Sequence, residues 1–343
     1  MLMLGLSAAG IVLPAAGNAA GSVLRPQATI AFPGGAHGIG FDDMDYFPEL
    51  EQVVVPSGQT GSLGFIDPVS GALTTIQGIT APRAAATGHG EGTTSVACGG
   101  GYLFASDRDD NQVVIVDPRT KKPLGRVQLD SAPDYVRYLS ATHELWVTEP
   151  RAFKIEVFNI GFDPQPLLTR VGVISVPGGP ESLIVDDARG LAYTNRWVLS
   201  TVAIDIHTRR IAAIWSNRCV GARGLALDAS AGFVFVGCDE GKAVVLDARH
   251  DGRVLATART GKGVDIVDYD QKLRHLYVPG ADSATLTILQ VDPAGHLQPV
   301  AVYKTANGAH CVVADQHAHA YVCDPHGGRV FEITDRSSAE SIP

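Results

Sequence analysis

Residues 221–248 read GARGLALDASAGFVFVGCDEGKAVVLDA and contain the pattern that decides the fold. The stretch starts with glycine and a variable residue, Arg223, and alternates apolar and polar residues up to Asp228. A turn and two further short apolar runs follow, the second ending in Asp247. Alternation of this kind predicts β-strands, and Gly and Asp between strands predict tight turns. The segment therefore predicts a small antiparallel sheet.

The same pattern occurs seven times along the chain. The copies are GAHGIGFD (35–42), GTTSVACGG (92–100), APDYVRYLS (132–140), GPESLIVDD (179–187), GARGLALDA (221–229), GVDIVDYDQ (263–271) and GAHCVVADQ (308–316). Each copy is followed by a second strand, a third that ends in Asp in most units, and a fourth. Four short strands in every 40 to 50 residues are typical of a β-propeller blade. We therefore expect an all-β fold, a single seven-bladed β-propeller of four-stranded antiparallel blades.

The two ends of the chain predict how the ring closes. The last copy supplies only three strands, whereas QATIAFPGG (27–35) resembles VGVISVPGG (171–179), which ends an earlier blade. We expect the N-terminal strand to complete the last blade, so that three strands plus one close the ring. Closure leaves no open sheet edge. The propeller should span residues 21–343, and we expect a monomer.

These repeats resemble a known family. PESLIVDDARGLAYTN (180–195), residues 221–248 and GKGVDIVDYDQKLRHLYVPGADSATLTI (261–288) are similar to the YVTN-type seven-bladed β-propeller repeat family. The resemblance covers residues 27–335 and implies a bacterial and often exported propeller. It implies little about function, because that group mixes binding proteins with relatives of lactonases.

Composition excludes several classes of function. The 343 residues carry a formal charge of −9 and no run of Lys or Arg, so no nucleic-acid partner is expected. There is no C-x-x-C-H motif for c-type haem, and nothing indicates a nucleotide. No G-x-S-x-G or H-E-x-x-H motif supports a serine hydrolase or a zincin.

The N-terminus predicts export. Residues 2–16 are apolar and are followed by small residues up to Ala20, which is typical of a signal peptide over residues 1–20. The apolar run is too short for a stable membrane span. We therefore expect a periplasmic or secreted protein.

Export permits disulfides among the five cysteines. Cys311 and Cys323 fall opposite one another in the predicted hairpin, and Cys219 and Cys238 bracket the open end of another. Both pairs are disulfide candidates, and Cys98 remains as a small apolar side chain.

Many acidic residues have a structural explanation. Asp side chains accept hydrogen bonds from backbone N–H groups in turns, and a recurrence at one blade position indicates that role. We assign it to the ends of the first strands, at Asp42, Asp186, Asp228, Asp270 and Asp315, and of the third strands, at Asp67, Asp117, Asp205, Asp247 and Asp292.

The variable residue five positions before each first-strand end is different. These ring positions are His37, Thr93, Asp134, Glu181, Arg223, Asp265 and His310, and six of the seven are ionisable. In a propeller they converge with the loops that follow the second strands, among them Asn195, Arg196 and Trp197. The sequence therefore predicts a polar mouth at one end of the central channel.

Two kinds of chemistry suit this mouth. Glu181, Asp265 and Asp134 are candidate ligands for a divalent metal such as Ca²⁺, Mn²⁺ or Zn²⁺. Glu181, Asn195 and Asp265 are similar in residue type to the metal cage of gluconolactonase and regucalcin-like propellers. Such a metal could polarise a lactone carbonyl and activate water.

Metal-free acid and base catalysis is the other chemistry. His37 and His310, on neighbouring blades, would act as base and acid, while Arg223 would hold a substrate carboxylate. The candidate substrate-binding residues are Asp134, Asn195, Arg196 and Trp197. Both schemes predict a lactonase-like hydrolase or a lyase acting on a sugar acid or lactone.

Three alternatives remain open. The mouth can be a water-filled polar channel without a ligand. The protein can be a non-catalytic binding or scaffold protein, with Met44, Tyr46, Phe47 and Leu50 of residues 42–52 as a contact patch for a protein partner. A quinone or haem redox role ranks third, because its docking motifs are absent.

Overall fold

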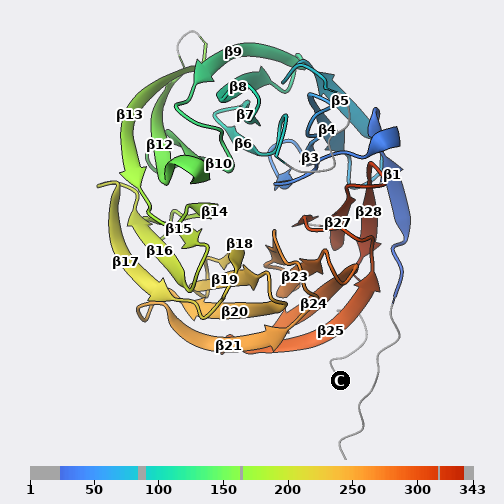
Figure 1. The fold of residues 1–343 in the computed structure, drawn as a ribbon, viewed down its shortest axis with the longest axis vertical. Coiled ribbons are helices and arrows are strands. Elements are labelled where there is room, and N and C mark those ends of the chain that lie inside the picture. The colour runs from blue at the N-terminus through green and yellow to red at the C-terminus, as the bar shows by residue number, and fades with distance from the viewer. Residues whose placement is uncertain (1–23, 84–89, 163–164, 316, 336–343) are drawn as a thin grey trace, which may run out of the picture.

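A computed structural model describes residues 24–83, 90–162, 165–315 and 317–335. Within them, 28 strands form seven four-stranded antiparallel sheets, arranged as blades around a central axis (Figure 1). The predicted seven-bladed propeller is therefore confirmed. The predicted signal peptide lies outside the described residues. No helix among these residues has the length and apolar character needed to cross a membrane.

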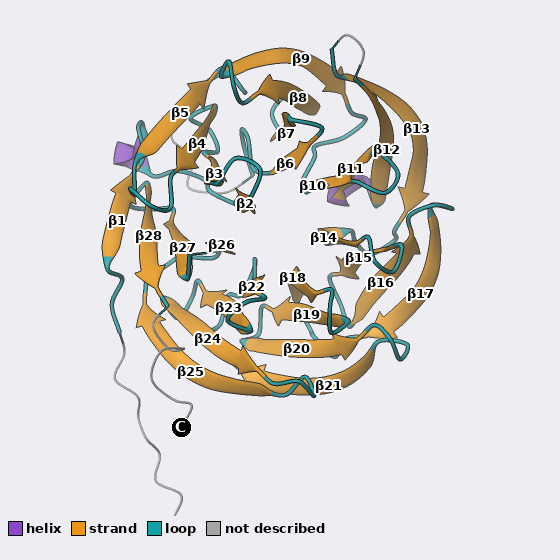
Figure 2. Ribbon diagram, turned by 180° about the vertical axis from the view of Figure 1, so that it is seen from behind, coloured by secondary structure: helices purple, strands orange, loops and turns teal. Residues whose placement is uncertain are grey.

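In each blade the four strands lie one outside the other, from the central axis to the outer edge (Figure 2). The inner strands are β2 (Asp45–Phe47), β6 (Val96–Gly99), β10 (Val136–Leu139), β14 (Glu181–Asp186), β18 (Ala222–Asp228), β22 (Asp268–Asp270) and β26 (Val312–Ala314). The second strands are β3 (Gln52–Pro56), β7 (Tyr102–Asp107), β11 (Glu144–Glu149), β15 (Leu191–Arg196), β19 (Phe233–Cys238), β23 (His275–Gly280) and β27 (His319–Asp324). The third strands are β4 (Ser62–Ile66), β8 (Gln112–Asp117), β12 (Lys154–Gly161), β16 (Ser200–Asp205), β20 (Lys242–Asp247), β24 (Thr285–Val291) and β28 (Arg329–Thr334). The outer strands are β5 (Leu73–Gln77), β9 (Lys122–Gln128), β13 (Leu167–Ser175), β17 (Arg210–Ser216), β21 (Arg253–Arg259), β25 (Leu297–Lys304) and β1 (Ala28–Ala31).

The N-terminal strand closes the ring as predicted. Strand β1 pairs antiparallel with β28, with Ala28 opposite Glu332, and so becomes the outer strand of the seventh blade. Leu24 also exchanges backbone hydrogen bonds with the neighbouring strand β25. The first and last strands of the chain are therefore joined within one sheet.

Burial explains the strand pattern. Strands β19 and β20 are packed between neighbouring blades and are almost wholly buried. They read as nearly continuous apolar runs, as strands covered on both faces do. The outer strand β17, by contrast, exposes most of its residues. The core therefore lies between blades and is distributed around the ring.

The turn aspartates that end the third strands behave as predicted. The Asp205 carboxylate accepts hydrogen bonds from the backbone N–H groups of His207 and Thr208, at 3.0 and 2.7 Å. The N–H bonds at such turns lower the pKa of Asp205. The other third-strand aspartates accept the same kind of bond, at Asp67, Asp117, Asp247 and Asp292.

The prediction of the first inner strand at residues 35–42 is wrong. Strand β2 begins at Asp45, whereas residues 35–37 form a short 3₁₀ helix. The side chain of Gln59 accepts a hydrogen bond from Gly40 N–H and donates one to the Gly38 carbonyl, which replaces strand pairing there. Met44 and Phe47 are buried, so the predicted contact patch at residues 42–52 is wrong for these two side chains.

Apolar side chains from several blades meet near the middle of the ring. Tyr135, Leu183 and Ile266, from three different blades, belong to one buried apolar cluster with Phe41. Asp43 precedes Met44 of this cluster in the chain and forms an ion pair with Arg137 of another blade. The two Arg137–Asp43 contacts measure 2.5 and 2.8 Å. A cavity of about 160 Å³ lies beside these side chains and is lined by Asp43, Tyr135, Arg137 and Ile266.

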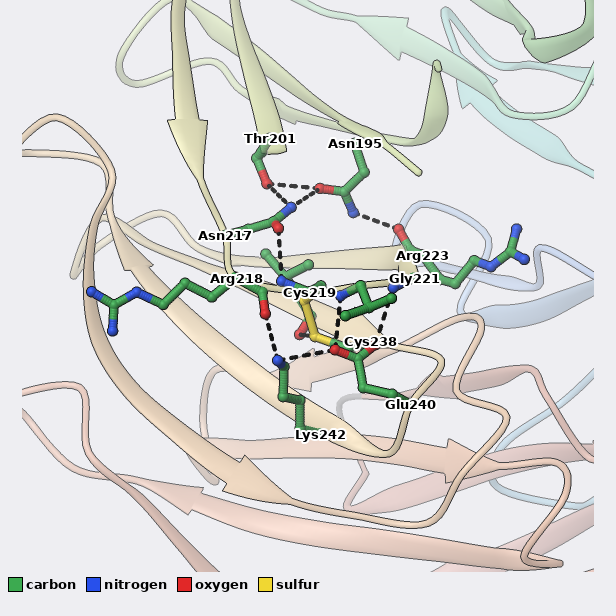
Figure 3. The surroundings of a disulfide bond; sticks show 12 residues. Asn195, Thr201, Asn217, Arg218, Cys219, Gly221, Arg223, Cys238, Glu240 and Lys242 are labelled. Atoms are coloured by element: carbon green, nitrogen blue, oxygen red, sulfur yellow. Dashed lines mark hydrogen bonds and ion pairs between the residues drawn. A yellow bond between two sulfur atoms is a disulfide. The ribbon is translucent and has the colours of Figure 1, made fainter. Parts of the chain in front are cut away.

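Two disulfides tie the segment just before an inner strand to the second strand of the same blade. Cys219 is joined to Cys238 and Cys311 to Cys323, the two pairs that the sequence suggested. Near the first of them, the Glu240 carboxylate accepts hydrogen bonds from Val220 and Gly221 N–H (Figure 3). Despite the desolvation that burial imposes, these N–H groups lower the pKa of Glu240 to about 2.

Candidate functional site

The predicted polar mouth is hollowed by two adjoining cavities. A cavity of about 330 Å³ is lined by Arg223, Asp265 and His310, together with residues of the loops that follow the second strands. A neighbouring cavity of about 290 Å³ is lined by Arg108, Asp134, Arg151, Glu181, Trp197 and Arg223. Arg223 borders both cavities. The inner-strand starts and the second-strand loops therefore form one site.

One side of the mouth holds a group of metal-ligand type. The carboxylates of Asp42 and Asp265 and the imidazole of His310 place their ligand atoms within 4.8 Å of one another. The residues come from the first, sixth and seventh blades. Carboxylate and imidazole are ligand types that Ca²⁺, Mn²⁺ and Zn²⁺ accept.

The His310 ring is held in place by backbone. Its Nε2 lies 3.0 Å from the carbonyl oxygen of Phe41, and its Nδ1 lies 2.7 Å from that of Gly308. Each ring nitrogen therefore faces a backbone acceptor, and a metal ion bound by His310 would take the place of one of these two contacts.

The other side of the mouth is rich in arginine. Arg108 lies 3.0 Å from the Asp134 carboxylate and 3.4 Å from that of Asp42, so it links the two sides. Arg223 lies 3.4 Å from Glu181. Arg108 and Arg223 therefore offset part of the negative charge of the carboxylates at the mouth.

Glu181 has an unusual acidity. Burial, and after it the negative charges of Asp134 and Asp265, raise its pKa to about 8. Arg223 opposes this shift, as does the hydrogen bond of 2.6 Å from Trp197 Nε1 to the carboxyl group. A carboxyl group with a pKa in this range can donate a proton near neutral pH.

The structure brings together most of the predicted site residues. His310, Arg223, Asp134, Glu181, Asp265 and Trp197 all line the mouth. Within it, Asp134 and Glu181 contact guanidinium groups, and Asp265 lies with Asp42 and His310. The predicted metal set of Glu181, Asp265 and Asp134 stays a prediction, whereas the ligand atoms of Asp42, Asp265 and His310 lie within 4.8 Å of one another.

Asn195 and Arg196 lie outside the cavity walls. Asn195 is fully buried, accepts a hydrogen bond from Thr201 and donates one of 2.6 Å to the Arg223 carbonyl (Figure 3). It supports the backbone that carries Arg223 instead of facing a ligand. Arg196 is half-buried and lines neither cavity.

His37 does not join His310. It is exposed and borders a separate cavity of about 390 Å³ with Gln59 and Arg83. Its ring position is occupied by Asp42, which the sequence analysis assigned to a turn. The sequence held a sign of this error: His37 and Thr93 are 56 residues apart, against 41 to 47 for the other neighbours.

Solved structures share this fold over nearly the whole chain. The Kuenenia stuttgartiensis hydrazine synthase matches with a TM-score of 0.71 and 13% identity, over 94% of this chain and 100% of that chain. A chain of the mitotic checkpoint complex matches at 0.72 and 12%, over 95% and 99%. The Myceliophteria thermophila Cps50 (Swd1) propeller domain matches at 0.70 and 12%, over 90% and 99%. At such identities the likeness shows the fold alone.

The sequence comparisons add no family. No protein-family model matches the chain, and none of the curated proteins matches its sequence.

Proposed function

We propose that the channel mouth binds a divalent cation through Asp42, Asp265 and His310, and beside it a small anionic ligand derived from a sugar. The convergence of these three ligand groups from three blades carries the proposal. It also revises the metal set expected from the sequence, because Asp42 takes the part that was given to Glu181 and Asp134.

The neighbouring cavity suits the ligand. Arg108, Arg151 and Arg223 can receive a carboxylate, and Trp197 offers a flat apolar face to a sugar ring. A metal beside them polarises a carbonyl and lowers the pKa of bound water. Glu181, with its raised pKa, can donate a proton to a leaving group. We therefore propose a lactonase-like hydrolase, with a lyase as the related possibility.

Metal binding tests the proposal directly. We expect the purified protein to bind Ca²⁺, Mn²⁺ or Zn²⁺ in calorimetric titration, and Asp265→Asn or His310→Ala to weaken that binding more than about tenfold, since ligands are lost outright. Asp292→Asn, at an exposed turn, is the matched control and should bind like the parent. Equal binding by all variants would refute the metal site.

Catalysis is tested on the same proteins. A panel of sugar lactones should be opened by the parent, whereas Glu181→Gln should lower kcat by about 10²-fold or more, the usual contribution of a general acid. A metal-binding protein without this turnover would leave a binding function only.

A second candidate function is non-catalytic binding of a protein partner at the same face. The side chains of Val198 and Val220 are 61% and 68% exposed. Their chain neighbours Leu199 and Cys219 share a backbone hydrogen bond, which places the two segments side by side. Phe153, also exposed, packs edge-on against Trp197. Apolar side chains gathered at a rim favour a partner surface. Introducing negative charge at this rim, by Val198→Glu with Val220→Glu, should abolish binding of the protein partner and leave metal binding unchanged.

We also propose that the protein is exported and belongs with the YVTN-type propellers. The two disulfides support the periplasm or the extracellular space, where such bonds persist. Mass spectrometry of the N-terminus of the mature protein tests cleavage near residue 20.

A further inference from the structure

His310 belongs to a second group of potential metal ligands. Cys311 follows it directly in the chain, and Cys323 lies opposite on β27. The ligand atoms of these three residues lie within 4.8 Å of one another. In the structure the two sulfurs are joined, and both cysteines are fully buried.

The other disulfide differs in its surroundings. Cys219 and Cys238 lie near Asn217, Glu240 and Lys242 (Figure 3). No group of three metal ligands includes either of these cysteines among the described residues. The two disulfides therefore form a natural comparison within one molecule.

We propose that reduction of the Cys311–Cys323 disulfide creates a Cys₂His site for Zn²⁺ or another thiophilic ion. A dithiol reductant supplies two electrons and two protons, is itself oxidised to a disulfide, and leaves two protein thiols. Binding of the ion then releases both thiol protons, and the thiolates and His310 become ligands. Cys₂His sets bind Zn²⁺ in proteins with one position open to solvent or substrate.

The site would change the metal preference of the mouth. Carboxylates with one imidazole suit Ca²⁺ and Mn²⁺ as well as Zn²⁺, whereas thiolates select Zn²⁺ and Cu⁺. His310 is common to both sets, so reduction draws it away from Asp42 and Asp265. This exchange rests on the proposed function, whereas the thiolate site itself does not.

His310 is the member of this group that borders the mouth. Its imidazole lines the cavity of about 330 Å³, whereas Cys311 and Cys323 are fully buried and do not line it. The proposal therefore requires that the bond be reducible while the propeller stays folded.

Two double variants test it. Cys219→Ser with Cys238→Ser keeps only the disulfide beside His310, and Cys311→Ser with Cys323→Ser keeps only the other. Each is reduced with a dithiol, desalted without oxygen, and titrated with Co²⁺ while circular dichroism monitors the fold. Cys98 is present in both variants and in the parent, so its contribution cancels.

We expect thiolate-to-cobalt charge-transfer absorption, saturating at a single ion per chain, only in the reduced first variant. Adding His310→Ala there should weaken Co²⁺ binding more than about tenfold, because a ligand is lost. Absence of new thiols in the folded protein, thiols without this absorption, or equal absorption in the second variant would overturn the proposal.

The same titration separates this site from the proposed function. Asp42→Asn with Asp265→Asn should abolish metal binding by the oxidised protein but retain the charge-transfer band after reduction. Loss of the band in that variant would contradict a separate thiolate site. Normal binding by the oxidised variant would instead contradict the carboxylate site.

Discussion

The carboxyl group of Glu149 is buried with few polar partners. It ends strand β11, and neither of its carboxylate oxygens has a hydrogen-bond partner among the described residues. Lys154 Nζ lies 3.4 Å away but also contacts Glu156 at 2.8 Å. Burial, followed by the charge of Glu156, raises the pKa of Glu149 to about 8.

This residue should make stability depend on pH. An acid whose pKa is higher in the folded state binds its proton more tightly there, so folding is favoured below the unfolded pKa and loses stability as pH rises toward 8. We expect Glu149→Gln to raise the free energy of unfolding by about 2 kcal/mol near pH 9, and to leave it unchanged near pH 5.

Urea unfolding at the two pH values measures the effect. Glu51→Gln, at an exposed turn, is the control and should show no such difference. A gain that is equal at both pH values would mean that the pKa of Glu149 is not responsible.

At the level of strands and turns, Asp228 joins two blades. It ends β18 and accepts hydrogen bonds from Ser230 Oγ and Ala231 N–H in its own turn. It also accepts one of 2.9 Å from the Tyr269 hydroxyl on the next blade. Although burial alone would raise the pKa of Asp228, these three donors lower it.

Asp228→Ala should destabilise the protein by about 2 kcal/mol, because the buried Tyr269 hydroxyl is left without its acceptor. Adding Tyr269→Phe removes that hydroxyl, so the double variant should lose less than the sum of the single losses. Because the pKa is lowered on folding, the benefit of Asp228 is present above the usual Asp pKa and disappears as pH falls through the folded value. Additive losses near neutral pH would contradict a direct Asp228–Tyr269 coupling.

The repeat explains which elements could be predicted from the sequence. Strand periodicity and turn aspartates recur at fixed blade positions, so local chemistry was enough to place six inner strands and the ring closure. The prediction was wrong for the first blade. GAHGIGFD has the residue pattern of the repeat, but hydrogen bonds from Gln59 hold its backbone outside the strand. Arg108 contacts Asp42 of the adjacent blade, and Arg137 of the third blade contacts Asp43 of the first. Such contacts join different copies, and no spacing within one copy reports them.

On the scale of the whole molecule, β1 and β28 hold the ring closed. Their pairing from Ala28 to Ala31 is the described contact that brings the N-terminal strand into the last blade. A covalent link at this seam should therefore stabilise the entire propeller, because it closes a loop of nearly the full chain.

We expect Ala28→Cys with Glu332→Cys, residues that face one another across the seam, to form a disulfide and raise the free energy of unfolding by about 4 kcal/mol. The same variant with Glu332 retained, which has a single new thiol, is the control. Thermal unfolding of the oxidised protein, compared with the control, measures the gain. An oxidised seam that melts no later than the control would show that opening of the ring does not limit stability.

The middle of the propeller has a consequence for the ligands of the mouth. Tyr135, Leu183, Ile266 and Phe41 belong to one buried apolar cluster, and Tyr135 and Ile266 also line a cavity of about 160 Å³, about half the volume of the 330 Å³ cavity at the mouth. On the proposed function, substrate and product share the larger space at the mouth. Product should therefore compete with substrate for free protein.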